Sequence, residues 1–312
     1  MTQQKSVAIT GATGFIGRAL TSLLTLHGYS IVALTRRAEH ARNVLPRGVT
    51  VIEWDGASPL EHDPRLLTCQ TIVNLMGESI GGLWTASKRR ELSESRIRAT
   101  RALVDAARSM GSLRCFIQAS AVGYYGPHGD EELLENAPSG DGFLAEVARS
   151  AEAEAAGAAS SSVRLVVLRT GLVLGSNGGM LGKMVLPVRL GVGGYPGKGT
   201  QWFSWVHVDD ETAAIQFLLE HTSISGPVNI TSPNPVRMKD FIKAAGRVLR
   251  RPVWMPVPAF ALRAALGRLA EETLLSGQRV LPQRLLESGF AFRFALVDAA
   301  LTDLLVQSRT SA

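Results

Sequence analysis

The feature of this sequence that most constrains its fold is a turn with glycines at three set positions, Thr10-Gly-Ala-Thr-Gly-Phe-Ile-Gly17. The turn follows a short apolar run at residues 6–10, and a helical pattern begins at Phe15 and stops at Gly28. In such a turn the first glycine allows the tight bend, the second lets a diphosphate approach the backbone, and the third lets helix and strand pack closely. The free N–H groups and the positive dipole end of the helix attract phosphate. The sequence therefore predicts a phosphate-binding turn at the first strand–helix junction of a βαβ unit.

Strand and helix patterns alternate through the first half of the chain, which is typical of a parallel sheet covered on both faces. A long helix is expected over roughly residues 84–110, and Arg96 interrupts its apolar stripe. We expect the Arg96 head group to find a carboxylate or solvent, with a role in a site as the alternative. The other expected strands are residues 31–34, 50–53, 71–75, 115–119 and 164–168.

These patterns predict the α/β class, with a doubly wound parallel sheet of the Rossmann type and a smaller, mostly helical C-terminal lobe. We assign residues 1–175 to the nucleotide-binding domain, to which residues 206–230 return. Residues 176–205 and 231–312 form the expected substrate-binding lobe. Two glycine-rich segments in the first part of that lobe suggest loops that fold over a ligand.

The end of the second strand distinguishes the two nicotinamide cofactors. A site for NAD places Asp or Glu there to bind the ribose 2′-hydroxyl, whereas this chain reads Leu34-Thr35-Arg36-Arg37. Guanidinium groups suit a 2′-phosphate, so the sequence predicts NADP(H). Trp54 is placed to flank the adenine, with ordinary packing as the alternative. The cofactor-binding residues expected from these segments, and from the segment after the fourth strand, are Gly11, Thr13, Gly14, Phe15, Ile16, Gly17, Thr35, Arg36, Arg37, Trp54, Asp55, Leu75, Gly77 and Glu78.

Composition narrows the class of protein further. Two cysteines among 312 residues give neither a disulfide framework nor a metal-ligand pattern, and they indicate a reduced, cytoplasmic setting. The histidines show no metal spacing, and His207 is interpreted as a buried, packed residue. We expect no signal peptide, because the polar N-terminus leads directly into a strand. No apolar stretch approaches the roughly 18–20 residues that cross a bilayer.

The net charge of +6 is distributed unevenly, with eleven Lys and Arg against four Asp and Glu between Val236 and Arg293. A basic lobe of this kind is compatible with nucleic acid, acidic lipid, a phosphorylated substrate or an ordinary solvated surface. No helix-turn-helix or aromatic-studded sheet motif accompanies it, which favours the solvated surface. We therefore expect a small-molecule substrate, no nucleic acid and no membrane partner, while a homo-oligomer stays open.

With these motifs identified, the chain resembles the extended short-chain dehydrogenase/reductases, and within them an atypical branch of nucleoside-diphosphate-sugar epimerase-like proteins. The resemblance covers essentially the whole chain. It implies a cofactor on the C-terminal edge of the sheet and a substrate between the two lobes, with Ser120 beside the nicotinamide. It also places Leu172 and Val173 at the nicotinamide border, as further cofactor-binding residues. The motifs that carry it are residues 10–17, 74–78, 95–97, 120–126, 169–175 and 201–209.

One departure from this family concerns proton transfer. Active members carry a Tyr-x-x-x-Lys helix in which the lysine lowers the pKa of the tyrosine. The matching stretch here has Phe143 and Val147 at those positions, and neither side chain transfers a proton. Two interpretations stay open: an NADP(H)-dependent oxidoreductase or epimerase-like enzyme acting on a small carbonyl or sugar-nucleotide substrate, and a non-catalytic NADP(H)-binding redox sensor that regulates a partner. For the enzyme, the candidate catalytic residues are Ser120, Tyr124 and Tyr125, with Lys183 or Tyr195 able to approach from the glycine-rich loops.

Overall fold

The computed structural model describes residues 5–60, 63–78, 80–82 and 84–306. Its centre is a seven-stranded parallel sheet with the strand order β12-β7-β5-β4-β1-β2-β3. The order reverses between β1 and β4, and such a switch point opens a crevice at the carboxyl ends of the strands, where ligands bind in this class of sheet. The strands are β1 (Ser6–Thr10), β2 (Ser30–Thr35), β3 (Thr50–Glu53), β4 (Thr71–Asn74), β5 (Cys115–Ala121), β7 (Arg164–Thr170) and β12 (Gly226–Ile230).

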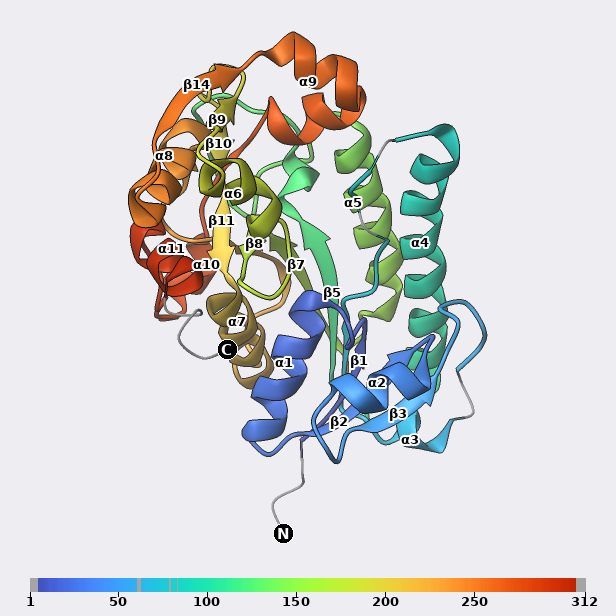
Figure 1. Ribbon diagram of the computed structural model, residues 1–312. Helices are drawn as coiled ribbons and strands as arrows, with labels where there is room; N and C mark the ends of the chain where they lie inside the picture. Colours follow the sequence, from blue (N-terminus) through green and yellow to red (C-terminus); the bar gives the residue numbers. More distant parts are fainter. Residues whose placement is uncertain (1–4, 61–62, 79, 83, 307–312) are drawn as a thin grey trace.

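Helices cover both faces of this sheet (Figure 1). Along β1, Val7 and Ile9 join the core on the side of helices α1 and α7, whereas Ala8 faces α4. Because both faces are buried, the strands read as nearly continuous apolar runs. The covering helices are α1 (Phe15–Leu26), α2 (Ala38–Val44), α3 (Pro64–Leu67), α4 (Ala86–Ser109), α5 (Phe143–Ala155) and α7 (Val208–Glu220).

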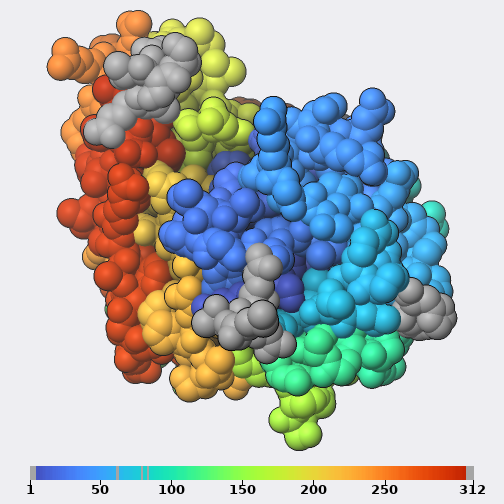
Figure 2. Space-filling model, turned by 90° about the horizontal axis from the view of Figure 1, so that it is seen from below, coloured from blue at the N-terminus to red at the C-terminus, as the bar shows by residue number. Residues whose placement is uncertain are grey.

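A second core, built around Trp205 and Phe241, joins segments that flank α7 in the sequence. Figure 2 shows the C-terminal segments, in orange and red, along one side of the blue N-terminal half. The division into a nucleotide-binding domain and a lobe at residues 175 and 230 stays a prediction. The elements outside the central sheet and its helices are η1 (Val122–Tyr125), β6 (Glu132–Leu133), η2 (Ala156–Ala158), β8 (Leu172–Leu174), α6 (Leu181–Arg189), β9 (Gly193–Pro196), β10 (Trp202–Phe203), β11 (Trp205–His207), β13 (Val236–Arg237), α8 (Met238–Leu249), β14 (Val253–Val257), α9 (Ala259–Leu266), η3 (Ala270–Leu274), β15 (Arg279–Val280), α10 (Gln283–Glu287) and α11 (Val297–Leu305).

The sequence-based elements can be compared directly with this fold. The Rossmann-type sheet and the mostly helical C-terminal part are confirmed, but β12 was not predicted as a strand. His207 is buried as expected, and its Nδ1 accepts the Asp209 N–H at 3.0 Å, which caps the start of α7. Among the residues described, no helix combines the length and the apolar character needed to cross a membrane.

Candidate functional site

The glycine turn has the geometry that the sequence predicted. Gly11 has φ +68°, and a Cβ there would lie 2.9 Å from the Leu75 carbonyl oxygen. A Cβ on Gly17 would lie 2.1 Å from the Gly11 carbonyl oxygen, so no larger residue fits without moving the turn. Helix α1 starts after Gly14 with no capping side chain and no acidic residue in its first turn. Its N-terminal N–H groups are therefore available to an anion.

Phe15, the first residue of α1, supports a second glycine-rich segment. A Cβ added to Gly175 or Gly178 would come within 2.4 or 2.5 Å of the Phe15 side chain, and one on Gly179 would lie 3.0 Å from the Phe15 ring. Only a chain without side chains at these positions can lie this close to the ring. The Phe15 side chain is thus used to seat residues 175–179 over the turn.

A hollow of about 520 Å³ lies beyond the ends of β2 and β3, where the sequence placed the adenosine. Arg36 lines it and is exposed, as is Arg37, while Thr35 accepts the Arg37 backbone N–H at 3.3 Å. Trp54 lines the same hollow but is also buried in the core. Its position is therefore compatible both with a contact to the adenine and with ordinary packing. Asp55 accepts hydrogen bonds from the Ser58 hydroxyl and from backbone N–H groups, which lower the pKa of Asp55 to about 2.

The segment after β4 is held by α4. Glu78 pairs with Lys88 at 2.6 Å, and the Arg96 guanidinium donates to the backbone carbonyls of Glu78 (3.0 Å) and Leu92 (2.9 Å). Burial lowers the pKa of Arg96, against the opposing influence of the Glu78 carboxylate. A Cβ on Gly77 would lie 2.9 Å from the Arg96 guanidinium, so the glycine allows this contact. Arg96 also lines the pocket at the carboxyl edge of the sheet, and a role in a site, the alternative interpretation of this residue, stays a prediction.

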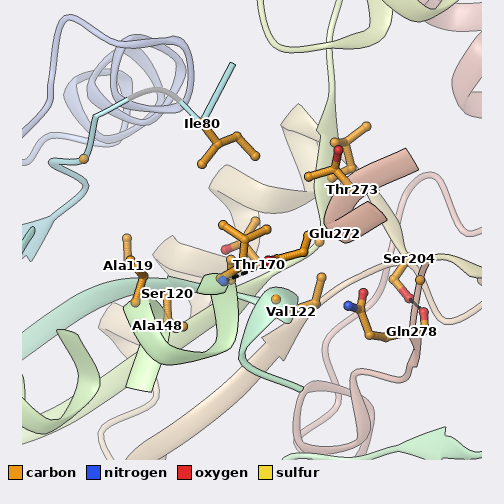
Figure 3. Close-up of a pocket in the computed structure, with 18 of the residues that line it drawn as sticks. Ile80, Ala119, Ser120, Val122, Ala148, Thr170, Ser204, Glu272, Thr273 and Gln278 are labelled. Atoms are coloured by element: carbon orange, nitrogen blue, oxygen red, sulfur yellow. Dashed lines mark hydrogen bonds between the residues drawn. The ribbon is translucent and has the colours of Figure 1, made fainter. Parts of the chain in front are cut away.

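A pocket of about 360 Å³ lies between the carboxyl edge of the sheet and the C-terminal segments, and we call it the main pocket because Ser120 lines it. Figure 3 shows Ser120 and Ala148 on one side of it and Ser204 and Gln278 on the other. Leu75, Gly77 and Leu172, three of the predicted cofactor residues, also line it. The position matches the cleft between two lobes that the resemblance implied.

Ser120 lines the pocket and is the first of a series of hydrogen-bonded polar side chains that leads into the interior. Its hydroxyl donates to Glu152 Oε1 at 2.6 Å. The Glu152 carboxylate forms a two-point ion pair with Arg169, with N–O distances of 3.1 and 2.9 Å. Burial disfavours the charged form of Arg169, yet its hydrogen bonds to Glu152 and Tyr125 raise its pKa above the ordinary value. Ser120 is thereby connected to a buried, fixed pair of opposite charges.

The two candidate tyrosines lie behind Ser120 and do not line the pocket. Tyr125 is fully buried; its hydroxyl donates to Asn229 at 2.7 Å and accepts from Arg169 at 3.1 Å. Burial raises the pKa of Tyr125. The Tyr124 ring lies under the Arg169 guanidinium, 3.5 Å from ring centroid to Cζ. Lys183 and Tyr195, the further candidates from the glycine-rich loops, do not line the pocket either.

Helix α5 turns a wholly apolar face to the pocket, formed by Leu144, Val147, Ala148 and Ala151. Phe143 points elsewhere, and its ring packs edge-on against Trp84 with centroids 5.3 Å apart. Two pairs four residues apart face the pocket, Leu144 with Ala148 and Val147 with Ala151, and Val147 is one of the two positions of the predicted match at Phe143 and Val147. The match at Phe143 and Val147 stays a prediction, and none of these side chains carries a hydroxyl or an amine.

Sequence reasoning missed three carboxylates around this pocket. Glu152 is described above. Glu272 lines the pocket and accepts the Leu144 N–H at 2.9 Å, at the N-terminus of α5. Glu211 is completely buried, and burial raises its pKa to about 8 although the Thr170 hydroxyl bonds to it at 3.0 Å. Acidic residues near a helix start are common, so the Asp-Asp-Glu at 209–211 gave no signal in the sequence.

Comparisons with known proteins extend over the whole site. A model of the NAD dependent epimerase/dehydratase family matches residues 7–231, and the domain of unknown function DUF1731 matches residues 257–304. Epimerase family protein YfhF of Bacillus subtilis is 38% identical, covering 98% of this chain and 99% of that protein. The chloroplastic SDR39U1 homolog of Arabidopsis thaliana is 40% identical, covering 96% of this chain and 86% of that protein.

A solved structure gives the same result. The crystal structure of human epimerase family protein SDR39U1 (isoform 2) with NADPH has a TM-score of 0.85 and 33% identity to this chain, and it covers 96% of this chain and 98% of that one. The resemblance to extended short-chain dehydrogenase/reductases, drawn from a few motifs, is thus confirmed along the chain. By sequence and by structure, this chain belongs to the NAD dependent epimerase/dehydratase family.

Proposed function

We propose that this chain is an NADP(H)-dependent oxidoreductase of the epimerase type, which acts on a hydroxyl or carbonyl group of a small molecule. The observation that carries the proposal is the 2.6 Å hydrogen bond from the pocket-lining Ser120 hydroxyl to Glu152. With the family's tyrosine and lysine missing from α5, this pair is a hydroxyl bonded to a carboxylate at the pocket wall. We propose it as the acid/base group of the reaction.

The residues present fit the cofactor. The turn at Gly11, Gly14 and Gly17 has no room for Cβ atoms at its first and third glycines, and it offers free N–H groups to a diphosphate. Exposed Arg36 beside the 520 Å³ hollow suits a 2′-phosphate. The human SDR39U1 structure, which is similar over 96% of this chain, contains NADPH. When bound, NADP(H) supplies or accepts the hydride.

The proton follows a short path through the chain's own side chains. Because Ser120 donates its only hydrogen to Glu152, its oxygen lone pairs remain to accept a hydrogen bond from a substrate hydroxyl. As that hydroxyl becomes a carbonyl, its proton moves to Ser120 Oγ and the Ser120 proton moves to Glu152. The reverse transfer protonates the oxygen of a carbonyl that is being reduced. Epimerisation requires both directions at one carbon, and the same pair serves both.

The proposal departs from the sequence-based expectation at one point. The sequence suggested that Tyr124 or Tyr125 assists Ser120. The Tyr125 hydroxyl is already engaged by Asn229 and Arg169 in the interior, and the Tyr124 ring packs against Arg169. Glu152, which contacts Ser120 directly, takes their place in the proposal. A cytoplasmic location stays a prediction, in keeping with Cys69 and Cys115, which are both buried and unpaired.

The test begins with a search for turnover. NADPH oxidation is followed with a panel of aldehydes, ketones and nucleotide sugars, and epimerisation is followed by product analysis. With a substrate in hand, Ser120→Ala and Glu152→Gln are each expected to lower kcat by on the order of 10²–10⁴ while NADPH binding is retained. The matched control is Glu154→Gln on the same helix, because Glu154 pairs with Arg101 away from the pocket. Full turnover in both Ser120→Ala and Glu152→Gln would rule out this pair as the proton path.

One observation favours a second function, that of an NADP(H)-dependent redox sensor. The whole pocket face of α5 is apolar, so the usual catalytic tyrosine and lysine have no equivalents on it. A sensor binds NADPH and NADP⁺ with different consequences for a partner and needs no proton path. Tight NADPH binding without reaction across the panel, together with unchanged behaviour of Glu152→Gln, favours the sensor over the enzyme.

A further inference from the structure

The C-terminal part of the molecule exposes large apolar side chains at one rim. Val192, Trp254 and Met255 are each 71% exposed, Phe260 is 73% exposed and Leu190 is 69% exposed. We call these five residues the apolar rim. Strands β9 and β14 pair in parallel, which brings the residues around 192 beside those around 254, and α9 follows β14 directly. An exposed apolar cluster of this kind marks an interaction surface.

The segments that form the rim carry charge of one sign only. Residues 180–200 and 243–268 contain no Asp or Glu, although they span α6, the end of α8, β14 and α9. Within the described residues, Arg247, Arg263 and Arg268 pair with acids from other segments, and the remaining six cations form no ion pair. The nine cations of these segments are Lys183, Arg189, Lys198, Lys243, Arg247, Arg250, Arg251, Arg263 and Arg268.

Cations and apolar side chains are interleaved within this rim. Arg189 directly precedes Leu190, and Arg250 and Arg251 stand just before β14 with its Trp254 and Met255. In Figure 1, β9, β14 and α9 lie at the end of the molecule far from the N-terminus, and α6 lies below them and packs against β9. None of the five rim residues lines the main pocket. The rim is therefore a surface separate from the proposed reaction site.

We propose that the apolar rim docks the chain on a membrane surface rich in anionic lipid. Exposed Trp, Phe and aliphatic side chains insert shallowly between lipid headgroups, and flanking Lys and Arg are attracted to anionic headgroups. A second copy of the chain docking through the same face would bring unpaired cations together, which is unfavourable. Nucleic acid suits the cations but gives Leu190, Val192 and Met255 nothing apolar to contact.

This docking is attachment to a surface, and it requires no segment that crosses the bilayer. It selects the acidic-lipid alternative that the basic lobe left open in the sequence, and so revises the expectation of a purely solvated face. The clustering could not be seen along the chain, because Leu190 and Trp254 are brought together only by the pairing of β9 with β14. The inference does not depend on the proposed chemistry at Ser120.

The test uses the full chain and large vesicles. Cosedimentation is expected with vesicles of phosphatidylcholine containing about one third phosphatidylglycerol, weakly or not at all with pure phosphatidylcholine, and less at high salt. Trp254→Ala combined with Phe260→Ala, and separately Arg250→Glu combined with Arg251→Glu, should each weaken binding by about tenfold or more. Brominated lipid should quench tryptophan fluorescence in the unmodified chain and lose most of this effect in Trp254→Phe.

The matched control moves the same kinds of change to the opposite part of the molecule. Leu26→Ala and Arg47→Glu alter an exposed leucine and an exposed arginine of the sheet-covering half, and vesicle binding should be unchanged. Unaltered circular dichroism and NADPH affinity in all variants show that they fold. No sedimentation with either vesicle, or equal binding by the rim variants and the unmodified chain, would overturn the proposal. A dimer that dissociates in Trp254→Ala would also overturn it, and would assign the rim to a second copy.

Discussion

The carboxyl edge of the sheet holds its functional groups in two different ways. At the β1–β2 end the groups are backbone N–H of the turn at residues 11–17 and exposed arginines within one βαβ unit. At the β5–β7 end they are side chains joined by hydrogen bonds across long sequence separations. Ser120 and Glu152 are 32 residues apart, Arg169 and Tyr125 are 44 apart, and Tyr125 and Asn229 are 104 apart.

The difference predicts which amino-acid substitutions each end can tolerate. A binding site made of backbone depends on glycines whose replacement fills the ligand's space, but it depends little on the rest of the fold. A site made of buried, mutually bonded side chains depends on every member, since the loss of one leaves another unsatisfied. The following experiments test this contrast, from the largest expected effect to the smallest.

Arg169→Met should destabilise the β5–β7 end, where the functional groups are hydrogen-bonded side chains. Arg169 and Glu152 are 5% and 12% exposed as side chains, so the variant leaves a carboxylate buried without its partner. We expect a loss of about 3–5 kcal/mol in the free energy of unfolding, measured by urea denaturation. The control is Arg101→Met, which breaks the more exposed pair with Glu154 and should leave the free energy of unfolding nearly unchanged. Equal losses in the two variants would contradict the contrast.

Gly14→Val should abolish most cofactor binding at the β1–β2 end without unfolding the chain. Gly14 has φ −74°, which valine can adopt, and the side chain would occupy the space of the diphosphate. NADPH affinity measured by calorimetry should fall by more than about a hundredfold, which corresponds to ~2.7 kcal/mol. Gly111→Val serves as the control, because a Cβ at Gly111 meets no atom within 4 Å. Normal NADPH binding by Gly14→Val would place the diphosphate elsewhere.

Glu211→Gln tests how much the burial of a carboxyl group near the β5–β7 end lowers the free energy of unfolding. Burial raises the pKa of Glu211 from 4.5 to about 8, so the folded chain keeps a proton that the unfolded chain releases. Below pH ~4.5 Glu211 is protonated in both the folded and the unfolded chain, and its burial does not lower stability. As pH rises from ~4.5 towards 8, the unfolded chain releases this proton and the folded chain keeps it, so the free energy of unfolding falls by up to ~1.4 kcal/mol per pH unit. Relative to the unmodified chain, Glu211→Gln should therefore gain stability steadily over this range. A difference in melting temperature that does not change with pH would show that Glu211 is ionised in the folded state.

Arg36→Ala tests a side-chain contribution that is expected at the β1–β2 end. Removing a charge-assisted contact to the 2′-phosphate should reduce the preference for NADPH over NADH by about tenfold. Fluorescence titrations with both cofactors measure it, and Arg42→Ala on α2 is the control for a general loss of positive charge. An unmodified chain that binds NADH as tightly as NADPH would remove the basis for this prediction.

The same contrast explains what could be predicted from the sequence. The turn, the first strands and the long helix α4 follow from local spacing, so their positions were predicted to within a few residues. Strand β12 was missed because Gly226 and Pro227 open it like a turn; it is an edge strand, where proline is tolerated. The Ser120–Glu152 contact could not be predicted, since it exists only once α5 packs beside β5.

The seat that the Phe15 ring provides for residues 175–179 has a consequence for the evolution of the family. A methyl group at Gly175 or Gly178 would collide with the Phe15 side chain, whereas a smaller residue at position 15 would leave space for one. Residue 15 and a segment about 160 residues later in the sequence therefore share the same limited space. Among homologues, residue 15 should vary together with positions 175 and 178, with alanine appearing at these two positions only where the aromatic ring is absent.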